Sequence, residues 1–210
     1  MDKFEKEIMV VPVNDLFNND SFQGFVHHSE NDFQSRILNF FQWMKRGLAE
    51  QDPNFKQPIA YCLIVNPELK KVFVYQRSTK AGEKRLHNMW SWGIGGHIDV
   101  PDLSLNKNPI QTSMLRELSE EIEIPQDSQI EPIVLGYINE DDTDVGKVHL
   151  GILYIIKTNA TEIKPKDSEV AQGRLMHINE LEEIYNSKEH DVETWSEIAF
   201  NPLKDFLNSL

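Results

Sequence analysis

The sequence predicts an α/β protein in which helices cover a β-sheet. Apolar runs rich in β-branched and aromatic residues, such as "IAYCLIV" and "KVFVYQR", are typical of strands, and they are mixed along the chain with segments of helical periodicity. Such mixing favours helices packed on a sheet. The 210 residues, 40% of them hydrophobic, suffice for one domain with a sizeable core. The sequence shows no internal repeat or low-complexity linker, which argues against a repeat array or loosely tethered domains.

Residues 1–57 are expected to form an N-terminal helical extension packed on the domain. The segment "SENDFQSRILNFFQWMKRGLAEQ" begins with the cap-type residue Ser29 and ends before Pro53. Its large apolar side chains recur at helical spacing, at Phe33, Ile37, Phe40, Phe41, Met44 and Leu48. One amphipathic helix is therefore predicted. Phe40, Phe41 and Trp43 are numerous enough to pack on the domain or to form a homodimer surface.

Strands and helices follow one another between residues 58 and 185, which we expect to form the main domain. "IAYCLIV" and "KVFVYQR" flank the turn-prone "NPELK" and predict a hairpin. A helix is predicted next, because Asn108 can cap it, Pro109 suits its first position and Pro125 can end it. Further strands are expected at "PIVLGYIN", "KVHLGILYII" and "RLMHI", then a short helix at "NELEEIY". Residues 186–210 should form a C-terminal helix around "ETWSEIAFNPLKDFL".

Charge and composition exclude several classes of protein. With 34 acidic and 21 basic residues, the formal charge of −13 should repel nucleic-acid polymers and anionic membranes. Apolar runs are shorter than the roughly 20 residues that span a bilayer, and the N-terminus does not resemble a signal peptide. Cys62, the only cysteine, cannot form an internal disulfide, so we expect a cytoplasmic protein. The seven histidines show no H-x-x-x-H or Cys-His spacing, which argues against a zinc site.

The helix predicted over residues 109–124 carries many carboxylates. Steps of three and four residues place Glu117, Glu120 and Glu121 within an arc of about 100°, beside an apolar stripe. Anions in the last helical turns oppose the helix dipole at a cost of up to ~1 kcal/mol each. An exposed pair between Arg116 and Glu120 would contribute only about 0.3 to 0.5 kcal/mol. A divalent cation would resolve this conflict, and the alternative is a solvated glutamate-rich face.

The segments "GIGGHIDVPD" and "RELSEEIEI" resemble the signature of the Nudix hydrolase superfamily, G-x5-E-x7-R-E-U-x-E-E-x-G-U, where U is a bulky apolar residue. The matching residues are Gly96, Arg116, Glu117, Leu118, Glu120, Glu121 and Ile124. Counted from Gly96, the first glutamate falls on Asp102, and 13 residues separate Asp102 from Arg116 where the signature has seven, so the motif would contain an insertion. Anchoring on Arg116 instead places Asn108 at the glutamate, a poorer fit. Glu123 stands where the signature has its last glycine, which casts doubt on the tight turn that usually follows the helix.

The resemblance, closest to a MutT-like phosphoesterase branch, implies a Nudix-type α/β/α sandwich with a mixed β-sheet over residues 58–185. It also implies hydrolysis of a phosphoanhydride bond in a nucleoside diphosphate-linked or related small molecule, with Mg²⁺ or Mn²⁺ as cofactor. The expected metal ligands are the Gly96 carbonyl, Glu117, Glu120 and Glu121, and the expected catalytic residues are Arg116, Glu117, Glu120, Glu121 and Glu169.

The sequence leaves three functional assignments open. Either Glu117 or Glu169 could act on the attacking water, and Glu169 could instead be a plain loop glutamate. The departures at Asp102 and Glu123 keep a ligand-sensing module without catalysis as the alternative function. An isomerase acting on an isoprenoid diphosphate is a third function, but the glycine segment lacks the neighbouring cysteine that such chemistry would use.

An acidic protein that binds phosphates needs local cations. Arg77, Lys84, Arg85 and His97 flank the glycine segment and are expected to bind substrate. The alternative is a soluble loop whose charge offsets acidic surroundings. A separate acidic connection, "NEDDTDVGK", carries Glu140, Asp141, Asp142 and Asp144 and is expected to be a solvated turn.

Overall fold

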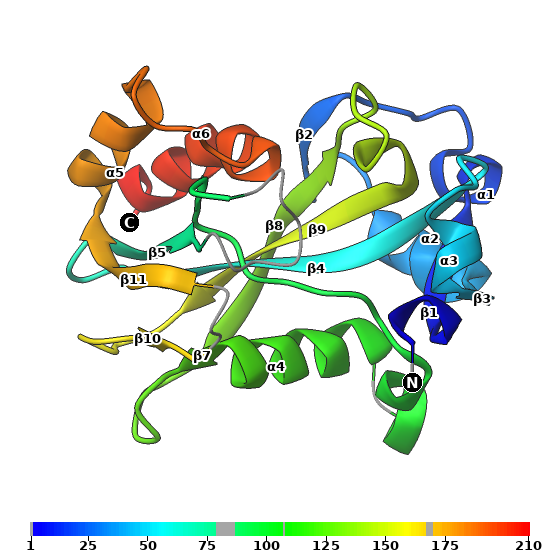
Figure 1. The fold of residues 1–210 in the computed structure, drawn as a ribbon, viewed down its shortest axis with the longest axis horizontal. Helices are drawn as coiled ribbons and strands as arrows, with labels where there is room; N and C mark the ends of the chain where they lie inside the picture. Colours follow the sequence, from blue (N-terminus) through cyan, green and yellow to red (C-terminus); the bar gives the residue numbers. More distant parts are fainter. Residues whose placement is uncertain (1, 79–86, 107, 167–169) are drawn as a thin grey trace. The chain divides into compact units, whose positions relative to one another are not determined.

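The computed structural model describes residues 2–78, 87–106, 108–166 and 170–210 (Figure 1). These residues form six α-helices and a large mixed β-sheet, so the predicted α/β class with a mixed sheet is confirmed. Hydrogen bonds connect the strands in the order β11-β5-β4-β9-β8-β2. Off this path, β1 pairs with β4 and with β3, and β6 pairs with β5. Within the described ranges, every helix is too short or too polar to cross a bilayer.

The strands of the sheet are β1 (Glu7–Pro12), β2 (Gly24–His27), β3 (Gln42–Lys45), β4 (Phe55–Asn66), β5 (Lys71–Arg77), β6 (Trp90–Ser91), β8 (Glu131–Asn139), β9 (His149–Lys157) and β11 (Val170–His177). Two short strands, β7 (Ile122–Glu123) and β10 (Lys164–Pro165), pair with each other. The helices are α1 (Val13–Phe17), α2 (Phe33–Phe40), α3 (Arg46–Ala49), α4 (Pro109–Glu121), α5 (Ile178–Asn186) and α6 (Thr194–Asn208), with 3₁₀ turns η1 (Lys3–Glu5), η3 (Val100–Asn106) and η4 (Gly146–Val148).

The chain folds as two compact units. Unit 1 consists of Met1–Tyr61, Gly95–Arg116 and Val134–Leu153, and unit 2 of Cys62–Ile94, Glu117–Ile133 and Tyr154–Leu210. β4, β8, β9 and α4 each contribute residues to both units. The predicted elements of the main domain are largely confirmed. β4 and β5 pair as the expected antiparallel hairpin, with Val65 opposite Val72, and Asn108 accepts a hydrogen bond from the backbone N–H of Ile110 at 3.0 Å at the start of α4.

The single long helix predicted in the N-terminal extension is wrong. Its first part is α2, whose cap is Asp32, not Ser29, because the Asp32 carboxylate accepts the backbone N–H of Ser35 at 3.0 Å. The chain then extends as β3, which pairs antiparallel with β1 and places Met44 opposite Ile8. Backbone pairing with a distant, buried strand outweighs helical spacing, because strand formation is decided mainly by packing partners. Phe40 is left 48% exposed at the end of α2.

The C-terminal helix is an integral part of unit 2. α5 and α6 lie side by side, with the rings of Tyr185 and Phe200 stacked at 4.1 Å (Figure 1). The hydroxyl of Ser196 in α6 accepts the backbone N–H of Trp92 at 3.0 Å, and the fully buried Trp92 ring packs against Phe200. α6 thereby covers the segment that leads into the glycine-rich motif.

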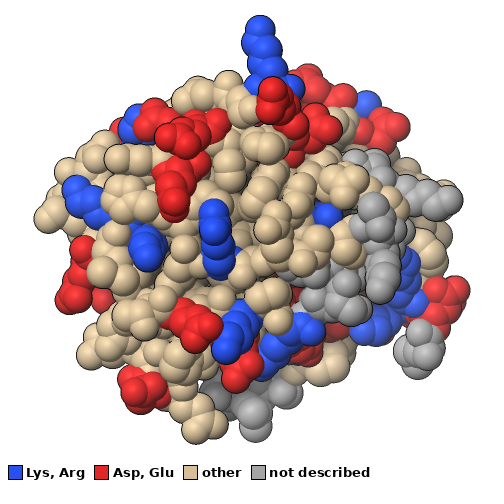
Figure 2. Space-filling model, turned by 60° about the vertical axis from the view of Figure 1, so that its left-hand side comes forward, with Lys and Arg blue, Asp and Glu red and all other residues tan. Residues whose placement is uncertain are grey.

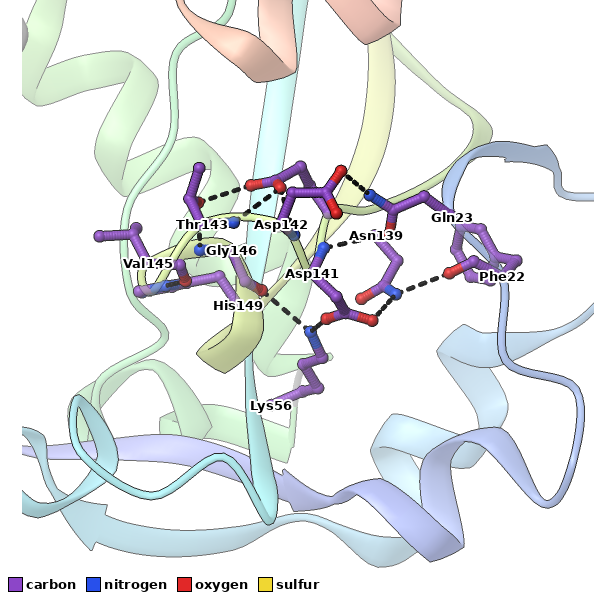
Figure 3. A network of polar contacts seen from close by, with 11 residues as sticks. Phe22, Gln23, Lys56, Asn139, Asp141, Asp142, Thr143, Val145, Gly146 and His149 are labelled. Atoms are coloured by element: carbon purple, nitrogen blue, oxygen red, sulfur yellow. Dashed lines mark hydrogen bonds and ion pairs between the residues drawn. The ribbon is translucent and has the colours of Figure 1, made fainter.

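The acidic connection between β8 and β9 is more ordered than a solvated turn (Figure 3). Glu140 is only 5% exposed, and its carboxylate accepts the backbone N–H groups of Asp142 and Thr143 at 2.6 and 2.9 Å. The buried Lys56 of β4 donates to Asp141 at 2.6 Å and to the carbonyl of Gly146 at 2.9 Å. The expectation of a solvated turn is therefore wrong for Glu140, because local N–H groups replace its water.

We expect Lys56→Ala to destabilise the protein by about 2 to 3 kcal/mol, because it removes two hydrogen bonds and leaves the Gly146 carbonyl without this donor. Lys147→Ala is the control, since Lys147 pairs with the exposed Asp144 and should change stability by less than about 0.5 kcal/mol. Urea unfolding at pH 7 measures both. Equal losses for the two variants would contradict the role of Lys56.

Candidate functional site

The three motif carboxylates lie in the last turns of α4. Glu117 and Glu121 are half-buried and Glu120 is exposed. The apolar stripe of this helix segment is buried, at Ile110, Met114, Leu118 and Ile122. The carboxylates therefore lie at the margin of the buried face, as the helical spacing predicts.

In unit 2, the charges of these carboxylates act on β4 and β5. Burial raises the pKa of the Cys62 thiol in β4, and the negative charges of Glu121 and Glu117 raise it further. Burial alone would lower the pKa of Arg77, but Tyr75, Glu193 and Glu121 raise it above its ordinary value. Arg77 is therefore a permanent cation within the electrostatic reach of Glu121.

A lysine from outside the helix binds the C-terminal end of α4, a contact that the sequence does not reveal. The ammonium group of Lys166 donates to the carbonyl of Ser119 at 2.8 Å, and its backbone N–H donates to the carbonyl of Glu121 at 2.8 Å. A lysine at this end offsets the dipole that opposes the carboxylates. The chain leaves the helix directly into β7, where Glu123 pairs with Lys164 of β10. This extended exit does not need the left-handed backbone for which a glycine is favoured.

The glycine segment before α4 is held against β4. In unit 1, a Cβ on Gly95 would lie 2.3 Å from the carbonyl oxygen of Ala60, so no larger residue fits this backbone approach. His97 forms an antiparallel bridge with Ile59 in the same unit. In unit 2, Ile94 exchanges two backbone hydrogen bonds with Cys62, at 2.7 and 3.0 Å.

Arg116 and Asp102 form a bidentate ion pair in unit 1. Arg116 Nε lies 3.0 Å from Asp102 Oδ1, and Nη2 lies 2.9 Å from Oδ2. Nη2 also donates to the carbonyl of His97 at 2.9 Å, and Asp102 accepts the backbone N–H of Asp99 at 2.9 Å. Asp102 is 2% exposed, so this buried pair attaches the loop after the glycines to α4.

The predicted substrate-binding residues lie in different surroundings. Arg77 Nε donates to Glu193 at 2.9 Å, and its guanidinium lies over the Tyr75 ring. The His97 ring instead lies in unit 1, with Nε2 2.7 Å from Gln57 Oε1 and 3.3 Å from Nε2 of His149. Lys84, Arg85 and Glu169 lie outside the described residues.

The two neighbouring histidines both have lowered pKa values. Burial, followed by the charge of Arg46 and by His149, lowers the pKa of His97 well below its ordinary value. Burial also lowers the pKa of His149, although Val145 and Glu50 oppose this shift. His149 was missed by sequence reasoning, and its only sequence signal is a polar residue at the start of an otherwise apolar strand.

The acidic surface makes local cations important for an anionic ligand. On the face drawn in Figure 2, blue lysine and arginine side chains are interspersed with red acidic ones. With a formal charge of −13, cations held at defined positions, such as Arg77, are the candidates for contacting phosphate.

We expect Arg116→Ala to destabilise the protein by about 3 kcal/mol, because it leaves the buried Asp102 carboxylate without its bidentate partner. In Asp102→Ala/Arg116→Ala no unpaired carboxylate remains, so the double variant should lose clearly less stability than the sum of the two single variants. Urea unfolding of the four proteins measures this coupling. Additive losses would show that the pair contributes no specific stabilisation.

The comparisons with known proteins identify the family. The NUDIX domain family matches residues 55–195, which is well over half of the chain. The chain therefore belongs to the Nudix hydrolase family.

Individual relatives extend the match beyond the domain. Protein YmaB of Bacillus subtilis (strain 168) is 35% identical over 212 residues, covering 97% of this chain and 100% of YmaB. The crystal structure of Tm1382, provisionally named a Nudix hydrolase, has a TM-score of 0.77 at 27% identity and covers 98% of this chain and 100% of Tm1382. The NUDIX domain of Shewanella oneidensis NrtR, complexed with ADP ribose, has a TM-score of 0.50 at 12% identity, with 72% and 88% covered, and shows the fold alone.

Proposed function

We propose that this protein cleaves a phosphoanhydride bond in a nucleoside diphosphate-linked or related small molecule, with Mg²⁺ or Mn²⁺ as cofactor. The observation that carries the proposal is the placement of Glu117, Glu120 and Glu121 on the last turns of α4, at the margin of its buried face. Three carboxylates at a helix C-terminus are unfavourable without a cation, and these three match the signature by which the sequence resembles the Nudix superfamily.

The donor set fits a hard divalent cation. Mg²⁺ prefers oxygen ligands in octahedral geometry and usually keeps several waters, so three carboxylates leave positions for water and phosphate oxygens. Bound there, the ion would neutralise phosphate charge and lower the pKa of a water. Glu117 is half-buried and is our choice for the general base that would act on the attacking water, while Glu169 and the Gly96 carbonyl stay predictions as base and ligand.

Arg116 and Asp102 would act by positioning. Their ion pair, with the bond from Arg116 to the His97 carbonyl, holds the loop that follows Gly96 on α4. This contact supports the alignment in which Asp102 takes the place of the first glutamate of the motif and the insertion lies between Asp102 and Arg116. A carboxylate paired in this way is engaged in the scaffold, which leaves metal binding to the glutamates.

Arg77 is our candidate for binding a substrate phosphate. Its side chain is held by Glu193 and Tyr75, so its orientation is defined before a ligand arrives. Its charge is permanent, and the negative potential of Glu121 reaches it. ADP ribose, the ligand of the NrtR domain, contains the linkage that we propose for cleavage, which makes dinucleotides and ADP-ribose the first compounds to assay.

We expect Glu120→Gln to lower kcat by at least ~100-fold with Mg²⁺ or Mn²⁺, because it keeps the shape and removes a metal-binding charge. Glu120 is exposed, so the variant should fold normally. Glu123→Gln is the matched control, since Glu123 is also exposed but lies in β7, and it should keep the full rate. The readout is phosphate-ester product released from a panel of nucleoside triphosphates, dinucleotides, ADP-ribose and sugar nucleotides. Equal rates for the two variants would contradict the proposal.

Ligand sensing without cleavage is the second candidate. Asp102 stands where the signature has its first glutamate and Glu123 where it has its last glycine, and these two departures favour a sensor. Calorimetric titration with the same panel separates the two functions. A sensor would bind one compound tightly and leave it intact with either metal ion, whereas a hydrolase would cleave it.

A further inference from the structure

We propose that Glu50, His97 and His149 form a binding site for one divalent transition metal ion of the Zn²⁺ type. These residues differ from the α4 carboxylates proposed to bind Mg²⁺, and the inference does not depend on the hydrolase function. All three belong to unit 1, although they are far apart in the sequence.

The spacing of the donor atoms suits one ion. Each of the three residues offers a ligand atom, and these atoms lie within 4.8 Å of one another. The Nε2 atoms of His97 and His149 are 3.3 Å apart. Two imidazoles bound to one tetrahedral zinc ion at 2.0–2.1 Å would have their nitrogens about 3.3 to 3.4 Å apart. The two rings therefore already have the separation that such an ion requires.

The hydrogen bond of His149 to the backbone leaves Nε2, the nitrogen that faces His97, as the one that can bind a metal. Its Nδ1 lies 2.7 Å from the carbonyl oxygen of Val145 (Figure 3). A carbonyl oxygen can only accept, so Nδ1 carries the proton and, in the neutral ring, Nε2 keeps its lone pair. Histidines that bind metals usually donate their other ring N–H to a carbonyl or carboxylate in this manner, which fixes the tautomer and the ring orientation.

Gln57 supplies a second, independent observation. Its side chain is fully buried on β4, with Oε1 2.7 Å from Nε2 of His97, and among the described residues its Nε2 finds no hydrogen-bond partner. Leaving a buried amide N–H unpaired is unfavourable, so the orientation that turns Oε1 toward His97 needs a reason. Binding of an ion through the amide oxygen would provide one. The donor set would then be two imidazole nitrogens, one carboxylate oxygen and one amide oxygen.

Metal binding would require one proton of His97 to move from one ring nitrogen to the other. Without metal, the His97 Nε2–H donates to Gln57 Oε1 and also faces the lone pair of His149 Nε2. When the ion binds, the proton of His97 moves to Nδ1, so Nε2 becomes a ligand and the ring stays neutral. No net proton release is required.

Glu50 would complete the site from the end of α3. Its side chain is 24% exposed, and one carboxylate oxygen accepts from Nε of Arg46 at 3.0 Å, which leaves the second oxygen for the metal. Arg46 both orients this carboxylate and competes with a cation for its charge. Because Glu50 is partly exposed, its carboxylate also connects the proposed site to solvent.

The types of donor atom determine which ion the site prefers, and their positions determine which segments the ion would connect. Imidazole nitrogens favour Zn²⁺ and similar ions, whereas Mg²⁺ prefers an all-oxygen set. The ion would connect the end of α3, the segment after Gly96 and the start of β9 within unit 1. Because the unfolded chain does not hold these residues together, binding would stabilise the folded state.

The test is a titration of the full-length, chelator-treated protein with Co²⁺ and then Zn²⁺. We expect the visible absorption of tetrahedral, nitrogen-bound Co²⁺, its displacement by one equivalent of Zn²⁺, and a rise in the thermal unfolding midpoint on Zn²⁺ addition. Glu50→Gln and His149→Gln should each weaken Zn²⁺ binding by about tenfold or more and remove that rise.

His28→Gln and Glu120→Gln are the controls, because His28 is an exposed histidine and Glu120 belongs to the other proposed site. Both should retain the Co²⁺ spectrum and the Zn²⁺ affinity. If His149→Gln fails to fold, the partly exposed Glu50 still decides the question. The proposal is overturned if wild type gives no tetrahedral Co²⁺ spectrum, if Glu50→Gln binds Zn²⁺ as tightly as wild type, or if Glu120→Gln abolishes Zn²⁺ binding.

Discussion

The buried ion pair between Arg116 and Asp102 is the interaction on which the motif geometry depends. Asp102 is almost fully buried, so its carboxylate is compatible with folding only because two guanidinium N–H groups and the backbone N–H of Asp99 replace water. The same guanidinium also binds the carbonyl of His97, next to Gly96. One side chain of α4 therefore sets the path of the loop that carries the glycine segment. This arrangement tolerates the longer loop between Asp102 and Arg116, because the contact depends on where the two ends lie and not on the length between them.

The end of α4 shows how a chain can keep carboxylates where a helix disfavours them. The dipole of α4 opposes negative charge at Glu117, Glu120 and Glu121, and Lys166 compensates part of this by binding carbonyls of the last turn. The helix then passes into β7, which pairs with β10, so the exit is set by strand pairing and Glu123 can stand where the family signature has glycine. The remaining conflict between dipole and carboxylates is the physical reason to assign a cation to this face. Arg77, fixed by Glu193, adds a permanent positive charge within reach of Glu121.

Two kinds of donor set occur in this chain, and they select different ions. The α4 carboxylates offer oxygen atoms at a partly exposed helix margin, which suits an ion that keeps several waters. The group of Glu50, His97 and His149 offers two imidazoles and one carboxylate in a largely buried setting, which suits an ion with stronger nitrogen preference and fewer ligands. His97 lies next to Gln57 and His149 in unit 1, and the phosphate contact that its position after the glycines indicates stays a prediction. The acidic loop between β8 and β9, held by Lys56, forms the scaffold from which Val145 orients His149.

The sequence alone determined the features that depend on neighbouring residues. The β4–β5 hairpin, the start of α4 at Pro109 with Asn108 as its cap, and the common face of Glu117, Glu120 and Glu121 follow from short-range spacing and capping chemistry. Only the tertiary structure decided that Gln42–Lys45 is a strand, that Lys166 binds the end of α4, and that His149 meets His97. These features arise from hydrogen bonds and packing between segments far apart in the chain, and local periodicity carries no information about which distant partner will lie alongside. The pairing of Asp102 with Arg116 likewise became visible only in the folded structure. The roles expected for Lys84, Arg85 and Glu169 stay predictions.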